Sequence, residues 1–201
     1  NRLDGNFHYK GNVFTTGIEA SAGPNLVCNT LSVDLKGGDA WFRWSILSWS
    51  SDRTWTAFNT LDDRWNEKPA WKGLSGADGI YLTEGPNFRN TRWGAVPKEC
   101  NLANSLCFNM LQSVNEAHKE IAATNGIYRN SEKTKRGILV DCDNPFIDAK
   151  HLDYRLKPEN EKLYPAADNP LNKYVKHDFY GLIRFADQPQ CAGAFRPKPC
   201  P

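Results

Sequence analysis

Aromatic and β-branched residues gather in four short segments of the first half of the chain, with Gly, Asn, Ser and Asp between them. Runs of these residue types bounded by turn-forming residues are typical of β-strands. The pattern predicts strands over residues 7–14, 26–35, 41–49 and 54–61. No internal repeat is evident along the chain.

After these segments, apolar residues recur at helical intervals from Leu111 to Ala122. Ser113 begins a Ser-x-x-Glu capping box, and an Asn-Gly pair ending at Gly126 supplies a left-handed stop. The pattern therefore predicts one clear helix over about 113–125.

The remainder of the chain contains two apolar segments, at residues 137–141 and 179–185, with a stretch between them that is punctuated by proline. These segments predict two further strands. Strands followed by a helix and more strands favour an α+β fold over alternating βαβ units. We therefore predict α+β architecture with mostly antiparallel β-sheets.

Composition narrows the class of protein. The 201 residues are 40% hydrophobic, 12% aromatic and 24% charged, and the formal net charge is +2. These values are ordinary for a globular protein and exclude a disordered chain. The charge balance does not favour nucleic acid as a partner. No apolar run approaches the roughly 20 residues that a membrane-spanning helix needs, so no membrane span is expected.

Six cysteines give an even count, and none of them forms a Cys-x-x-Cys pair. This pattern favours a disulfide framework over a metal site and suggests a secreted, extracellular protein. Cys191 and Cys200 are the candidate local pair, closing a proline-rich loop. The alternative is a set of buried thiols.

Candidate chemistry is sparse outside one carboxylate pair. The four histidines are scattered, and Asp141 and Asp143 alone are a weak metal motif, so no metal is expected. On an extended segment, Glu159 and Glu161 would point the same way and act on one small substrate. The alternative is a solvated loop of Glu and Lys residues.

Four separated blocks gain meaning when they are read together. They are Asp-Arg-Trp-Asn-Glu-Lys-Pro at 63–69, Cys-Phe-Asn-Met-Leu-Gln-Ser at 107–113, the strand with the Asn-Pro-Phe-Ile-Asp and Pro-Glu-Asn-Glu segments that follow it at 137–161, and Phe-Tyr-Gly-Leu-Ile-Arg at 179–184. In order and spacing, these blocks resemble the mono-ADP-ribosyltransferase toxins, in particular the cholera and heat-labile enterotoxin A-chain family. The resemblance covers about two-thirds of the chain.

The resemblance implies a site and a substrate. Arg64 corresponds to the arginine that grips NAD, and Asn66 stands where the family has Asp. Glu159 and Glu161 correspond to the Glu-x-Glu pair. The sequence departs from the family in the middle block, where Asn109 and the two residues after it replace Ser-Thr-Ser. The residues implied to bind NAD are Arg64, Asn66, Asn109 and Ser113.

The implied chemistry is transfer of ADP-ribose from NAD to a host target protein. Arg64 would clamp a phosphate or ribose oxygen. Loss of nicotinamide leaves a positively charged sugar, which Glu161 would stabilise while Glu159 orients or deprotonates the acceptor. The implied protein is a secreted toxin or effector that acts with a receptor or a delivery subunit.

This interpretation divides the chain into two parts, and two other functions stay open beside it. Residues 1–60 would form an aromatic-rich β extension packed on an ADP-ribosyltransferase-like region, 61–201. The alternatives are a catalytically dead relative and a non-enzymatic, β-rich secreted effector that binds a host protein or a sugar. The enzyme requires Arg64, Glu159 and Glu161 to converge on one cleft.

Overall fold

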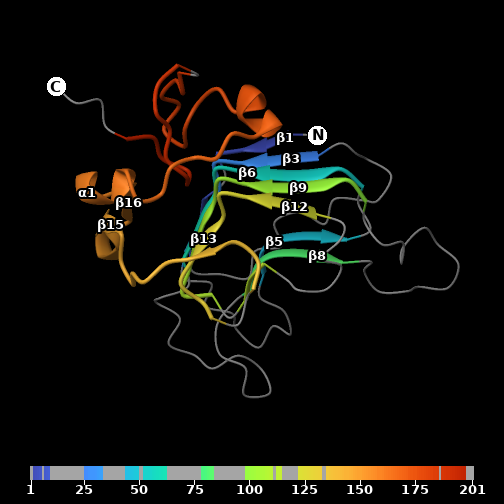
Figure 1. The fold of residues 1–201 in the computed structure, drawn as a ribbon, viewed down its shortest axis with the longest axis horizontal. Helices are drawn as coiled ribbons and strands as arrows, with labels where there is room; N and C mark the ends of the chain where they lie inside the picture. Colours follow the sequence, from blue (N-terminus) through green and yellow to red (C-terminus); the bar gives the residue numbers. More distant parts are fainter. Residues whose placement is uncertain are drawn as a thin grey trace, which may run out of the picture.

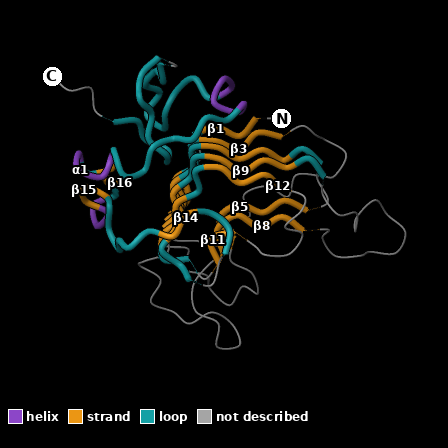
Figure 2. The backbone as a smooth tube through the Cα atoms, viewed as in Figure 1, coloured by secondary structure: helices purple, strands orange, loops and turns teal. Residues whose placement is uncertain are grey.

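The structure is a computed structural model, and it describes most of the chain in segments. The described residues are 2–5, 7–9, 25–33, 44–49, 52–62, 78–83, 98–110, 112–114, 122–132, 135–185 and 187–197. Strands dominate the described part of the first 139 residues, and loops with short helical turns dominate what is described after it (Figure 1; Figure 2). No helix in the described segments has the length and apolar character that a membrane crossing requires.

Three parallel sheets form the body of the protein. The first sheet has five strands in the order β1 (Arg2–Asp4), β3 (Asn25–Cys28), β6 (Thr54–Ala57), β9 (Cys100–Ala103) and β12 (Ala122–Asn125). The second has six in the order β14 (Ile138–Leu139), β13 (Tyr128–Arg129), β10 (Leu106–Phe108), β7 (Thr60–Asp62), β4 (Leu31–Val33) and β2 (Phe7–Tyr9). The third has three in the order β11 (Gln112–Val114), β8 (Asp78–Thr83) and β5 (Trp44–Trp49).

The chain visits these sheets in rotation. It runs β3, β4, β5, then β6, β7, β8, then β9, β10, β11, so each circuit adds one strand to every sheet. The result is a parallel β-solenoid, in which each coil contacts the coil before it and the coil after it. Figure 1 shows the strands of the first sheet lying one above another.

A two-residue corner joins the first sheet to the second in every coil. The first residue of each corner has a positive φ, between 48° and 67°, and we call this stack the corner row: Gly5, Asn29, Phe58, Asn104 and Gly126. Glycine and asparagine are the residues that adopt this left-handed conformation most readily. At Gly126 a Cβ atom would also lie 2.6 Å from the Oδ1 atom of Asn104, so glycine fits this position best.

In three successive coils the second corner residue is polar, and Thr30, Asn59 and Ser105 form a ladder inside the same edge. The Oδ1 atom of Asn59 accepts a hydrogen bond from the backbone N–H of Thr30, and the backbone N–H of Asn59 donates to the Oγ atom of Ser105. The Asn59 side chain also donates to the carbonyl of Val27. These buried contacts tie three successive coils together.

Apolar side chains that point inward fill the solenoid. The interior cluster draws on all three sheets and consists of Val27, Ile46, Leu61, Ile80, Cys100, Leu102, Cys107, Met110, Val114 and Ile127. Alternate residues of the same strands point outward, because side chains on a strand alternate between the two faces of the sheet. Many outward residues of the first and second sheets are apolar too, including Leu26, Leu31 and Phe108, so the outer faces of these two sheets need a cover.

The C-terminal segment, residues 140–185 and 187–197, supplies that cover (Figure 2). It contains a β-hairpin of β15 (Phe146–Asp148) and β16 (Asp153–Leu156) with the turn η3 (Ala149–His151), then α1 (Pro158–Glu161) and η4 (Pro170–Tyr174). Aromatic residues such as Phe146 and Tyr164 pack on the outer face of the second sheet, against Phe108. Leu171 and Val175 pack on the first sheet.

The predicted fold class was wrong in two respects. The sheets of the solenoid are parallel, and only the β15–β16 hairpin is an antiparallel pair among the named strands that the structure describes. The predicted helix over 113–125 was also wrong, since β11 and β12 occupy its two ends. Gly126 has the left-handed backbone that was expected, but it turns a strand into a corner instead of ending a helix.

The prediction that disulfides stabilise the protein was wrong as well. No disulfide is found among the five cysteines that the structure describes, and Cys200 lies outside the described residues. Cys107 is buried inside the solenoid, and Cys191 is buried within the C-terminal segment, in the cluster that packs on the second sheet. Burial stabilises this protein where covalent links were expected. Strands from both sides of residue 60, the predicted division, share the first and second sheets.

The corner residue Asn104 provides a test of how the segment is attached. Its side chain donates to the carbonyl of Ala167 and to the Oδ1 atom of Asn172, and it accepts from the N–H of Ala167. We expect Asn104→Gly to lower the free energy of unfolding by about 2 kcal/mol through these lost hydrogen bonds. We expect Asn104→Ala to lower it by about 1 kcal/mol more, because alanine resists the left-handed backbone.

Equilibrium unfolding in urea measures both values. The exposed Asn144 is the control, since its side chain accepts one long hydrogen bond of 3.4 Å, and Asn144→Ala should stay within about 0.5 kcal/mol of the parent. Equal stability of Asn104→Gly and the parent protein would contradict this account of the attachment.

Thiol reactivity tests the absence of a disulfide at Cys191. Burial raises the pKa of Cys107 and of Cys191 to about 12, while Cys142 is partly exposed. We expect iodoacetamide to label Cys142 before Cys107 and Cys191 in the native protein, because the accessible thiolate is the reactive species. In urea without reductant, Cys191 should become reactive too. Failure of Cys191 to react there, as measured by mass spectrometry, would contradict the structure.

Candidate functional site

The structure places the predicted carboxylate pair on a helix. Glu159 and Glu161 lie on the single turn of α1, not on an extended segment. Residues two apart on a helix point about 200° away from each other, so the two carboxylates do not share a direction. Desolvation raises the pKa of Glu161, which is partly buried, and Glu159 is exposed. Arg64 and Asn66, their predicted partners, lie outside the described residues.

Asn109, which was predicted to bind NAD, makes hydrogen bonds to neighbouring coils of the solenoid. Its backbone follows β10 with a φ of 55°, and its N–H donates to the Oδ1 atom of Asn130. Its side-chain amide donates to Asp62 at 2.8 Å and accepts from Asn130. These contacts link the coil ends of β7, β10 and β13. Ser113 lies in β11, and its side chain is outside what the structure describes.

No group of three or more potential metal-binding side chains is found among the described residues. Asp141 and Asp143, the weak metal motif, are exposed on the loop that follows β14. The structure instead directs attention to a pocket that the sequence did not indicate.

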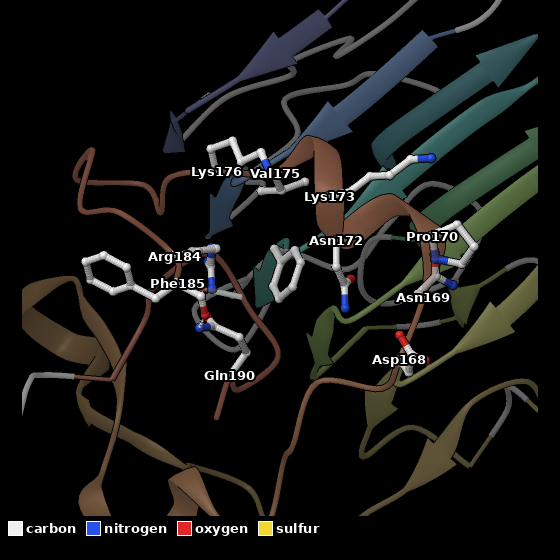
Figure 3. A pocket seen from close by; sticks show the side chains of 11 residues that line it. Asp168, Asn169, Pro170, Asn172, Lys173, Val175, Lys176, Arg184, Phe185 and Gln190 are labelled. Atoms are coloured by element: carbon white, nitrogen blue, oxygen red, sulfur yellow. Dashed lines mark hydrogen bonds between the residues drawn. The ribbon is translucent and has the colours of Figure 1, made fainter. Parts of the chain in front are cut away.

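This pocket has a volume of about 380 Å³ and lies where the C-terminal segment meets the corner row (Figure 3). The volume falls within the range of small-molecule pockets, roughly 300–1,000 Å³. Phe58 of the corner row forms one wall, and η4 with the residues around it forms another. The third wall comes from Arg184, Phe185 and Gln190.

Arg184 is the central polar residue of the pocket, and only 7% of it is exposed. Its Nε atom donates to the carbonyl of His177, and its Nη2 atom donates to the carbonyl of Gly193 at 2.9 Å and to the Oδ1 atom of Asn29. The guanidinium carbon lies 4.2 Å from the centre of the Phe58 ring. Its Nη1 atom is buried and makes no hydrogen bond to the residues that the structure describes.

A tight turn holds Arg184 in this position. Residues His177 and Ile183 form an antiparallel bridge, and the carboxylate of Asp178 accepts from the N–H groups of Tyr180 and Leu182. The backbone N–H of Arg184 then donates to Lys176. The strand predicted over residues 179–185 is therefore a turn. It directs one charged side chain inward and leaves its apolar neighbours exposed.

Gln190 is the second incompletely bonded group of the pocket. Its Nε2 atom donates to the carbonyls of Phe185 at 2.8 Å and of Gln188 at 3.3 Å. These two acceptors fix the orientation of the amide, because only the NH₂ group can face them. The Oε1 atom is buried and accepts no hydrogen bond from the described part of the chain. Figure 3 shows the Gln190 amide on the same side of the pocket as Arg184.

The charges around the pocket are mainly positive. Arg184, Lys173 and Lys176 line it with one carboxylate, the exposed Asp168. Burial lowers the pKa of Arg184 to about 10, so the guanidinium stays charged at neutral pH. No ion pair to Arg184 is found in the part of the chain that the structure describes. The buried Asp178 carboxylate attracts this charge and makes its burial less unfavourable, while the lining of the pocket itself stays mainly positive and suits an anion.

Comparison of the chain with family models, with curated proteins and with solved structures finds no match. The assignment of this site therefore depends on its geometry. One signal for it was present in the sequence, since Arg184 is the single charged residue in the apolar run from Phe179 to Phe185. A lone charged residue in such a run indicates either a turn that is exposed to solvent or a buried polar site. The sequence does not tell these apart, because the partners of a buried charged residue are distant in sequence.

Proposed function

We propose that this protein is a binding module whose Arg184 pocket takes a small anionic ligand. The observation that carries the proposal is the Nη1 atom of Arg184, which is a charged hydrogen-bond donor buried in the pocket wall without a partner. This proposal follows the alternative of a non-enzymatic, β-rich protein that acts by binding.

The energetics of the guanidinium support an anion as the ligand. Hydrogen bonds to charged groups stabilise by about 1.5–3 kcal/mol, and an unsatisfied buried donor costs a similar amount. An anionic oxygen at Nη1 would supply the missing acceptor and would be attracted by the positive charges of the lining. Lys173 and Lys176 at the pocket would add attraction that salt screens.

Transfer of ADP-ribose from NAD, action on a host protein and secretion stay predictions. The residues that would grip NAD, Arg64 and Asn66, lie outside the described part, and the fold that the resemblance implied is not the fold observed. NAD is itself an anion, and it belongs among the ligands to be tested.

A titration observed on the protein tests the proposal. With ¹⁵N-labelled protein, cyclohexanecarboxylate should shift the amide signals of Lys176, Arg184 and Gln190, and the uncharged cyclohexanemethanol should not. We expect Lys176→Gln to weaken binding about threefold, because it removes a positive charge from the pocket. Arg184→Lys should weaken it by about tenfold, because lysine lacks the planar fork.

The matched control is Lys150→Gln, which removes one exposed positive charge from η3, away from the pocket lining. Equal weakening by Lys150→Gln and Lys176→Gln, or equal binding of the neutral alcohol, would contradict the proposal. NAD in the same titration tests the cofactor prediction. Shifts at Arg184 would support NAD as a ligand of this pocket, and unchanged spectra would argue against it here.

A further inference from the structure

We infer that the anion is a hydroxylated carboxylate of the kind found in acidic sugars, with its carboxylate at Arg184 and a neighbouring hydroxyl at Gln190. This inference rests on the proposed function and adds a chemical class to it. Two buried groups on the same side of the pocket carry it, because one lacks an acceptor and the other lacks a donor.

The Oε1 atom of Gln190 requires a donor from the ligand. Its own NH₂ group is already committed to the carbonyls of Phe185 and Gln188, so the amide cannot turn over without losing both hydrogen bonds. An amide oxygen only accepts. A ligand that offers acceptors alone, such as a fully ionised phosphate or a plain carboxylate, leaves this oxygen unsatisfied.

The charge of the pocket selects the donor. An ammonium and a hydroxyl both donate, but Arg184, Lys173 and Lys176 would repel an ammonium placed beside Gln190. A hydroxyl carries no charge and meets no such repulsion. The ligand therefore combines a negative group with a neutral O–H close to it.

The remaining walls are apolar and suit the body of a ring. Phe58, Pro170, Val175 and Phe185 contribute to the lining together with the polar groups. A sugar ring presents C–H groups on its faces and hydroxyls around its edge, so its faces match these walls. An acidic monosaccharide thus supplies the carboxylate, the hydroxyl and the apolar face in one molecule.

Three ring compounds of similar size separate the contributions. D-glucuronate has the carboxylate and hydroxyls, cyclohexanecarboxylate has the carboxylate alone, and methyl β-D-glucoside has hydroxyls without the charge. We expect glucuronate to bind about tenfold more tightly than cyclohexanecarboxylate, which corresponds to one satisfied buried acceptor. The glucoside should bind more weakly than either carboxylate.

Gln190→Met provides the matched variant, because methionine has similar length and no amide. It should remove the advantage of glucuronate, weakening glucuronate about tenfold more than cyclohexanecarboxylate, with unchanged near-UV circular dichroism as the test of folding. The wild-type comparison of the three ligands needs no variant, so it decides the question even where Gln190→Met fails to fold.

The outcomes distinguish the two proposals. Equal affinity of the wild-type protein for glucuronate and cyclohexanecarboxylate would overturn the hydroxyl inference and leave the anion site standing. Equal weakening of both ligands by a folded Gln190→Met would do the same. Binding of neither carboxylate would overturn the proposed function together with this inference.

Discussion

The left-handed backbone of the corner row is the constraint on which the rest of the structure depends. At Asn29, Phe58 and Asn104 the chain turns between two sheets within two residues, which lets strands from successive coils stack in register. The same residues face the C-terminal segment. Asn104 bonds it through Ala167 and Asn172, and Asn29 bonds it through Arg184. One row of side chains thus both shapes the solenoid and attaches its cover.

This attachment explains why a charged residue is buried. Arg184 reaches the corner row from a turn of the C-terminal segment, stacks on Phe58 and bonds Asn29 and the carbonyl of Gly193. Gly193 itself needs to be glycine, since a Cβ there would lie 2.8 Å from Leu106. Together with the hydrogen bond from Nε to the carbonyl of His177, these contacts use two nitrogens of the guanidinium and leave the third in the wall of a pocket. The proposed binding site is therefore a by-product of how the segment is held.

The sequence predicted strands well where their residues are β-branched or aromatic, as in residues 26–35 and 54–61, each of which contains two short strands and a corner. It did not predict their pairing, because parallel pairing joins residues separated by a whole coil. The register shows the difficulty: Leu26 pairs with Trp55, and Trp55 with Asn101, so the spacing changes from coil to coil and no fixed repeat appears. The false helix over 113–125 arose because apolar residues from Leu111 to Ala122 recur at helical intervals, although β11 and β12 occupy the two ends of that range. The Arg184 pocket was not predictable either, since its walls are brought together from Phe58, η4 and Gln190 by tertiary packing.

A crystal structure of the protein with D-glucuronate tests the central claim most directly. The account predicts the carboxylate within hydrogen-bonding distance of the Nη1 atom of Arg184 and a hydroxyl donating to the Oε1 atom of Gln190, with the segment still bonded to Asn29 and Asn104. A carboxylate bound elsewhere on the molecule, or Arg184 directed away from the corner row, would contradict it.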